Sequence, residues 1–104
     1  MFARASTVEG TRDRLEDGIA MLEHAVMDEL QHIEGFSGII ALADRETGRN
    51  LVITLWETED AMRSSEEQAN RLRKGAADAL GASATPQVER YEVVLQEMRT
   101  PVHA

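Results

Sequence analysis

The sequence predicts an α+β fold, in which one antiparallel sheet of four strands carries two helices on one of its faces. Three observations predict this class. Four segments have the alternating or continuously apolar pattern of strands, two longer segments have the spacing of amphipathic helices, and their order is strand, helix, strand, strand, helix, strand. We expect a single domain over residues 1–99 and a flexible C-terminal tail over residues 100–104.

The segment 51–57, LVITLWE, is the predicted central strand. Its residues are mostly β-branched, aromatic or leucine, which are the types that strands favour. Side chains alternate between the two faces of a strand, so one face carries Val52, Thr54 and Trp56 and the other carries Leu51, Ile53 and Leu55. Both faces are largely apolar and need cover. The protein's own helices cover one face, and we expect a second copy of the chain to cover the other.

Two strands and a helix precede the central strand. Residues 2–8 alternate larger with smaller side chains and predict the first strand. Residues 12–33 predict an amphipathic helix, because large apolar residues recur at steps of three or four: Leu15, Ile19, Leu22, Val26, Leu30 and Ile33. Gly35 ends this helix. Residues 36–44 predict the second strand, which forms a hairpin with the central strand through residues 45–49.

The second helix is predicted over residues 58–80, with Thr58 as its N-cap and Gly75 as a candidate break. Its inward positions are smaller than those of the first helix: Met62, Ser65, Ala69, Leu72 and Ala76. Small side chains facing a sheet leave either a cavity, here near Ser65 and Ala69, or a close approach of helix and sheet. Both alternatives remain open at this point. Residues 86–98 alternate charged with apolar side chains and predict the last strand.

Composition excludes several classes of function. The formal net charge of −8 disfavours binding to nucleic acid and to anionic membrane surfaces. The absence of cysteine excludes disulfides, thiolate nucleophiles and cysteine-ligated metals. The three histidines do not stand at metal-ligand spacing, so no metal site is predicted. No apolar run is long enough to span a membrane and no signal peptide is recognisable, so we expect a cytoplasmic protein.

The predicted order of elements is the split βαβ, or ferredoxin-like, arrangement, βαββαβ. Both helices then lie on one sheet face and leave the other bare. An exposed apolar face of this size marks an interaction surface, and two such sheets packed face to face would bury both. We therefore expect a homodimer that is built through the sheet face.

Two stretches resemble the antibiotic biosynthesis monooxygenase (ABM) family of dimeric α+β barrels. The first is Leu55-Trp56-Glu57-Thr58 with the following Glu59-Asp60-Ala61-Met62, and the second is Tyr91-Glu92-Val93-Val94-Leu95. In addition, Gly35-Phe36-Ser37-Gly38 matches a turn common in the family, with Glu34 in place of its proline. The likeness extends over residues 2–98.

The resemblance implies a cofactor-independent monooxygenase that acts on a small aromatic or quinone-like substrate. In such enzymes the substrate anion itself reduces dioxygen, and the protein supplies a closed apolar pocket, positioning and electrostatics. The candidate catalytic residues are Trp56 as pocket wall or hydrogen-bond donor, Asn70 and either Arg63 or Arg71 as anion stabilisers, and Tyr91 or His24 as proton-transfer groups.

Two alternatives stand beside this hypothesis. The chain could be a non-catalytic homodimer of the same fold, either structural or binding a small molecule, because each candidate residue also has an ordinary packing or surface role. Haem degradation is disfavoured. By the resemblance it needs an axial histidine on the second helix and an asparagine in the first strand, whereas residues 58–80 contain no histidine and the first strand has Arg4, Ala5 and Ser6.

Overall fold

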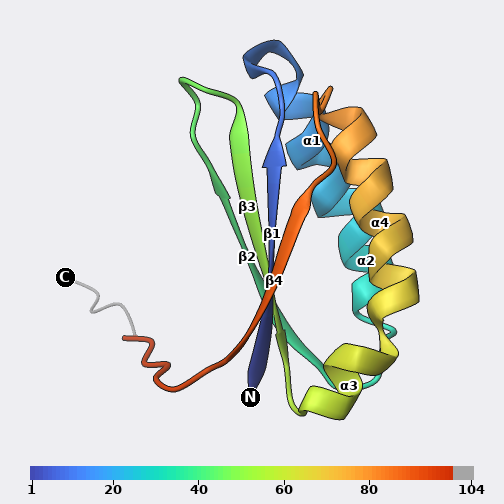
Figure 1. Cartoon of the computed structure of the whole chain (residues 1–104), viewed down its shortest axis with the longest axis vertical. Helices are drawn as coiled ribbons and strands as arrows, with labels where there is room; N and C mark the ends of the chain where they lie inside the picture. Colours follow the sequence, from blue (N-terminus) through green and yellow to red (C-terminus); the bar gives the residue numbers. More distant parts are fainter. Residues whose placement is uncertain (100–104) are drawn as a thin grey trace, which may run out of the picture.

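The computed structural model describes residues 1–99. Its four strands form one antiparallel sheet in the order β2-β3-β1-β4, with the helical segments on one face (Figure 1). The strands are β1 (Phe2–Glu9), β2 (Phe36–Ala43), β3 (Arg49–Trp56) and β4 (Gln87–Glu92). This is the predicted ferredoxin-like α+β arrangement, with the segment around Leu51 in a central strand.

The segment between β1 and β2 is not the single helix that the spacing predicts. It consists of a short 3-10 turn, η1 (Arg12–Arg14), α1 (Leu15–Met21), a π-helical stretch η2 (Leu22–Val26) and α2 (Met27–Leu30). Leu22, Val26 and Leu30 are all buried. Consecutive steps of four residues drift around a regular helix of 3.6 residues per turn, and the wider π turn keeps these side chains facing the sheet.

The second predicted helix is divided at Ser65 into α3 (Glu59–Ser64) and α4 (Glu66–Ala79). The Thr58 side chain accepts a hydrogen bond from the Ala61 amide at 3.0 Å, which confirms the predicted N-cap. The predicted break at Gly75 is wrong, because α4 continues through it. At Ser65 the hydroxyl donates to the carbonyl oxygen of Met62 and competes with regular helix hydrogen bonding.

The core between sheet and helices has two parts. One centres on Trp56, which is fully buried and packs with Leu22, Val26, Leu30 and Met62. The ring of Phe36 meets the Trp56 ring edge-on, with centroids 5.6 Å apart. The other part lies at the opposite end of the sheet and comprises Val8, Leu15, Ala77 and Leu80. The helices therefore cover the face of β3 that carries Trp56, a choice between the two faces that the alternation left open.

The other sheet face has no cover within residues 1–99, and we call it the open face. By strand register it carries Ala3, Ala5 and Thr7 from β1, Gly38, Ile40 and Leu42 from β2, Leu51, Ile53 and Leu55 from β3, and Gln87, Glu89 and Tyr91 from β4. Ile40, Leu42 and Tyr91 are 44%, 50% and 53% exposed. An apolar sheet face is thus open to solvent in the single chain.

The last strand is shorter than predicted. β4 ends at Glu92, where it pairs with Phe2, and the Val93 amide donates to the carbonyl oxygen of Met1. Beyond this point β1 offers no further partner, so residues 93–99 leave the sheet and run away from it (Figure 1). The predicted tail, residues 100–104, lies outside the described part of the chain. Within residues 1–99 no helix is long and apolar enough to cross a bilayer.

Candidate functional site

A cavity of about 60 Å³ lies between the helices and the covered face of the sheet. Ten valine, leucine, isoleucine and alanine side chains line it, among them Ala69 and Ala76 of α4. The small side chains of the second helix thus leave a cavity, one of the two predicted alternatives, although Ser65 is not part of its lining. Four polar residues also line it: Arg4, Ser6, Thr54 and Arg73.

Arg4 is the most deeply buried of these polar residues, with 2% of its surface exposed. It points from β1 toward the junction of α3 and α4, where its Nη2 donates to the carbonyl oxygen of Met62 and, at 3.0 Å, to Ser65 Oγ. The guanidinium lies 5.4 Å from the centre of the Trp56 ring, within the range of a cation–π contact. Among the residues that the structure describes, the buried Nε–H of Arg4 finds no hydrogen-bond partner.

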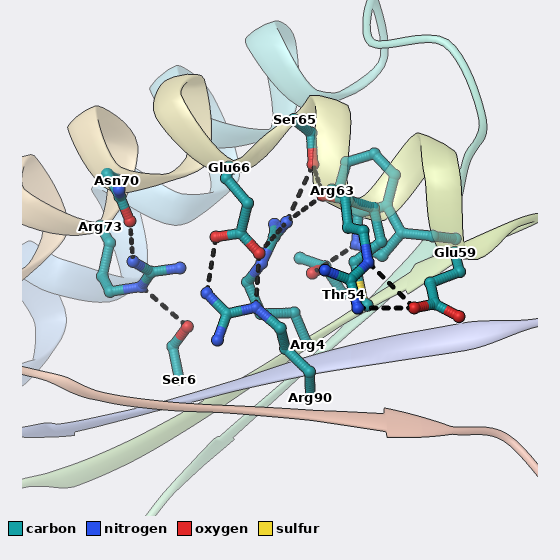
Figure 2. A network of polar contacts seen from close by, with 12 residues as sticks. Arg4, Ser6, Thr54, Glu59, Arg63, Ser65, Glu66, Asn70, Arg73 and Arg90 are labelled. Atoms are coloured by element: carbon teal, nitrogen blue, oxygen red, sulfur yellow. Dashed lines mark hydrogen bonds and ion pairs between the residues drawn. The ribbon is translucent and has the colours of Figure 1, made fainter.

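Glu66, at the start of α4, is the counter-ion of Arg4, at 3.2 Å. Arg90 of β4 reaches the same carboxylate with two hydrogen bonds, at 2.5 and 2.7 Å (Figure 2). These bonds from Arg90 are the main reason that the pKa of Glu66 lies below its ordinary value. Burial lowers the pKa of Arg4, and the carboxylate of Glu66 offsets only part of this shift. One carboxylate therefore serves two guanidinium groups.

Arg73 approaches the cavity from α4 and is half-buried. Its Nε donates to Ser6 Oγ at 2.9 Å and its Nη1 donates to Asn70 Oδ1 at 2.5 Å (Figure 2). Both partners are neutral. Burial, and then the charge of Arg4, lower the pKa of Arg73. A second cation thus stands beside the cavity with neutral groups as its hydrogen-bond partners.

Thr54 is the fourth polar residue of the lining and pairs directly with Arg4 across strands β1 and β3. Its Oγ1 accepts a hydrogen bond from the Trp56 indole N–H at 2.9 Å. Because a hydroxyl both accepts and donates, the Thr54 proton is left for another acceptor. Trp56 therefore orients Thr54 toward the cavity, although Trp56 is not itself part of the lining.

Two other candidates from the second helix lie near this network. Asn70 accepts from Arg73 and so holds one of the cavity arginines. Arg63 is exposed and pairs with Glu59 one helical turn earlier, at 2.7 Å. Arg71, the alternative to Arg63, is also exposed. Neither Arg63 nor Arg71 lines the cavity.

The two predicted proton-transfer groups lie away from the cavity. His24 is exposed, although it stands within the π-helical stretch whose Leu22 and Val26 line the cavity. Tyr91 is on the open face, and its hydroxyl donates to Glu89 at 2.7 Å. That hydrogen bond raises the pKa of Tyr91. Catalytic roles for His24 and Tyr91 remain predictions.

The sequence analysis did not single out Arg4, Ser6, Thr54 and Arg73 as site residues. A signal existed for β1, because Arg4 and Ser6 alternate in phase with Phe2 and Val8 and so occupy its inward face. A charged residue in phase with apolar ones is uncommon on a buried face. For Arg73 the pattern gave no such signal, since it is one of three basic residues close together in α4.

Comparison by sequence yields relatives in Mycobacterium tuberculosis. No family model matches the chain. The uncharacterized proteins Rv2557 and Rv2558 of strain H37Rv are each 36% identical to it, over 93 and 103 residues, which are 89% and 99% of this chain. The chain spans only 41% and 43% of the length of these relatives.

Comparison by structure is more informative. The chain matches a monooxygenase from the gene ActVA-Orf6 of Streptomyces coelicolor, solved with the ligand nanaomycin D, with a TM-score of 0.76 and 14% identity over 95% of this chain and 92% of the other. A protein of Bordetella bronchiseptica assigned to the antibiotic biosynthesis monooxygenases matches with a TM-score of 0.70 and 21% identity, over 90% and 97% of the two chains. The chain has the ABM fold.

The ABM fold was predicted from the motif around Trp56, and these matches confirm it at the level of fold. A dimeric ferredoxin-like protein from an uncultured marine organism has the same fold, with a TM-score of 0.67 and 13% identity over 95% of this chain and 92% of the other. Within residues 1–99, no group of three or more histidine or carboxylate side chains is arranged to hold a metal ion.

Proposed function

We propose that this ABM-fold domain binds a small phenol or hydroquinone in the cavity and oxidises it with dioxygen, without a cofactor. One observation carries the proposal. The polar groups of the cavity wall are two guanidinium groups and two hydroxyls, all of which can donate hydrogen bonds, and Arg4 and Thr54 meet at one point of this wall. Such a site favours a bound phenol in its ionised form, which is the form that reacts with dioxygen.

The role of each residue follows from its contacts. The buried Nε–H of Arg4 and the hydroxyl of Thr54 are both available to the substrate oxygen, and the positive charge of Arg4 lowers the pKa of the substrate hydroxyl. Trp56 is a positioning residue, since it holds Thr54 and packs against Arg4. Asn70 positions Arg73 in the same way.

The reaction needs no external reductant. For a phenol with hydrogen at a carbon ortho or para to the hydroxyl, one oxygen atom of dioxygen bonds to that carbon and becomes the second carbonyl of a quinone. The other oxygen atom leaves as water, with the hydrogen of that carbon and the hydrogen of the hydroxyl. The substrate supplies all the electrons, so the protein supplies only position, charge and exclusion of water.

The size of the cavity limits the substrate. A dry cavity that takes up benzene has a volume of about 150 Å³, whereas this one has about 60 Å³. A single ring therefore enters only if half-buried side chains at the wall, such as Leu72 and Ile39, move outward. We expect one-ring substrates to react better than fused-ring ones.

Oxygen uptake with a panel of phenols, hydroquinones and hydroxyanthrones tests this function. Thr54→Val keeps the shape of the side chain and removes its hydroxyl, so we expect kcat/KM to fall about 10- to 100-fold. Thr85→Val is the matched control, because Thr85 is exposed, lies outside the sheet and does not line the cavity. Equal activity of Thr54→Val and wild type, or no uptake with any compound, would refute the proposal.

A second candidate is a non-catalytic domain that binds a small molecule. It is favoured by the absence of any histidine, carboxylate or tyrosine from the residues that line the cavity, since proton transfer usually employs one of these. The two candidates differ in one measurement, because the second predicts ligand binding without oxygen consumption.

We further propose that the domain acts as a homodimer joined through the open face. Support comes from the exposed Ile40 and Leu42 on that face and from the exposed Val94 and Leu95 beyond β4. Covering such apolar side chains is a common route to dimerisation. The dimeric ferredoxin-like protein of the same fold is a precedent.

A further inference from the structure

Arg73 stands at the cavity without a charged partner among residues 1–99. The salt bridges formed within residues 1–99 do not include Arg73, and the two groups that accept hydrogen bonds from it, Ser6 Oγ and Asn70 Oδ1, are neutral. Positive charges also outnumber negative charges around Arg73. Glu66 already serves Arg4 and Arg90, so Arg4, Arg73 and Arg90 together face one carboxylate.

Arg73 and Ser6 also have hydrogen-bond donors that their mutual contact and Asn70 do not use. A guanidinium has five N–H groups, and the bonds to Ser6 and Asn70 occupy two of those of Arg73. Ser6 accepts from Arg73 and keeps its own proton to donate. The corner formed by Arg73 and Ser6 therefore offers donors and positive charge, which an anionic acceptor would satisfy.

The spacing of the two polar corners is set by the strand. Ser6 is two residues beyond Arg4 on β1, and both side chains point to the cavity face. Two residues of an extended strand span about 7 Å. Along β1, the corner of Arg4 and Thr54 and the corner of Arg73 and Ser6 are thus separated by about the length of an aromatic ring with its substituent.

We propose that the ligand of this cavity is a phenol that carries a carboxylate, with the carboxylate held by Arg73 and Ser6 and the phenolic oxygen directed to Arg4 and Thr54. This names the substrate class of the proposed oxidation. The role of this ligand as a substrate rests on the proposed oxidation, whereas its binding to the cavity does not. Inorganic phosphate fits less well, because it has no apolar part to place against the valine, leucine and alanine side chains of the wall.

Trp56 provides a direct measurement of binding. It is the only tryptophan in the sequence, and Arg4 and Thr54 both contact its indole ring system. The fluorescence of Trp56 is followed during titration with 4-hydroxybenzoate, with its neutral analogue 4-hydroxybenzamide and with inorganic phosphate. We expect the affinity to be highest for 4-hydroxybenzoate, lower for the amide and lowest for phosphate. We expect the carboxylate to bind at least about tenfold more tightly than the amide.

Two variants test whether Arg73 binds the carboxylate of the ligand. Arg73→Gln should reduce the affinity for 4-hydroxybenzoate about tenfold or more and leave that for the amide unchanged. Arg71→Gln removes the same charge from an exposed position of α4 and should change neither. Equal affinity of wild type for carboxylate and amide, stronger binding of phosphate, no effect of Arg73→Gln or no binding of any probe would overturn the proposal.

The outcomes also separate this inference from the proposed oxidation. Carboxylate-selective binding without oxygen uptake supports the ligand class and removes the catalytic function. Oxygen uptake with neutral hydroquinones, together with equal binding of acid and amide, supports the function and overturns the ligand class. The comparison of acid with amide uses wild-type protein, so it remains decisive if Arg73→Gln does not fold.

Discussion

At the scale of single residues, Arg4 is the least expected feature of this protein. A charged side chain 2% exposed is costly to desolvate unless it is fully paired. Arg4 has one carboxylate, which it shares with Arg90, and one N–H without a partner. Its burial is thus better explained by a role at the cavity than by a contribution to folding stability.

This reasoning predicts that Arg4→Met does not destabilise the fold. The groups that accept from Arg4 keep other partners, because Ser65 Oγ still donates to the carbonyl oxygen of Met62 and Glu66 still binds Arg90. We expect the free energy of unfolding, measured by urea denaturation, to stay the same or to rise by about 1 to 3 kcal/mol.

Glu66→Gln is the matched variant for Arg4→Met. It removes the anion and leaves the guanidinium of Arg4 buried, so the free energy of unfolding should fall. A loss of more than about 2 kcal/mol in Arg4→Met would show instead that the charge-assisted hydrogen bonds of Arg4 stabilise the fold.

At the scale of elements, the packing of α1 against the end of α4 depends on a glycine. A Cβ atom built on Gly18 would lie 2.1 Å from Cδ2 and 2.5 Å from Cγ of Leu80, which is itself buried. The two helices approach closely at this point because Gly18 has no side chain. By contrast, a Cβ atom on Gly75 of α4 would meet only the terminal methyl group of Met21, at 2.7 Å.

The two glycines therefore predict opposite effects of alanine. Gly18→Ala should lower the free energy of unfolding by about 1 to 3 kcal/mol, because the buried Leu80 cannot move freely. Gly75→Ala should be neutral or raise it by up to about 1 kcal/mol, because alanine favours the helix and Met21 is flexible. Urea denaturation of both variants checks this, and a Gly75→Ala protein less stable than Gly18→Ala would contradict it.

At the scale of the whole molecule, the open face determines assembly. The helices cover one side of the sheet, and the other side exposes Ile40 and Leu42 to solvent. Leu51, Ile53 and Leu55 of the central strand lie beside them, half-buried. A sheet of this kind is stabilised when a second apolar surface covers it.

This predicts that Leu42→Asp separates the proposed dimer. We expect wild type to sediment with twice the mass of the chain at micromolar concentration and Leu42→Asp to sediment as a monomer, because a charge would be buried in the interface. Ala20→Asp, on the exposed side of α1, is the control and should remain dimeric. A folded wild-type monomer at that concentration would exclude the dimer.

The sequence by itself determined the order of the elements, the two faces of β3 and the N-cap at Thr58. These features depend on the periodicity of neighbouring residues and on one local hydrogen bond, so a single stretch of sequence contains them. The small side chains of α4 also indicated a cavity as one of two alternatives. Trp56 and Asn70 were named in advance, and the structure shows that they form hydrogen bonds with Thr54 and Arg73, two residues of the cavity lining.

Only the tertiary structure decided which charged residues meet at the cavity. Arg4 reaches Ser65 and Glu66 from the far end of the sequence, and Arg73 reaches Ser6. The end of β4 at Glu92 was also decided by the tertiary structure, since it depends on the extent of β1. Periodicity reports which face a side chain occupies, whereas ion pairs and cavities depend on which distant residue lies opposite.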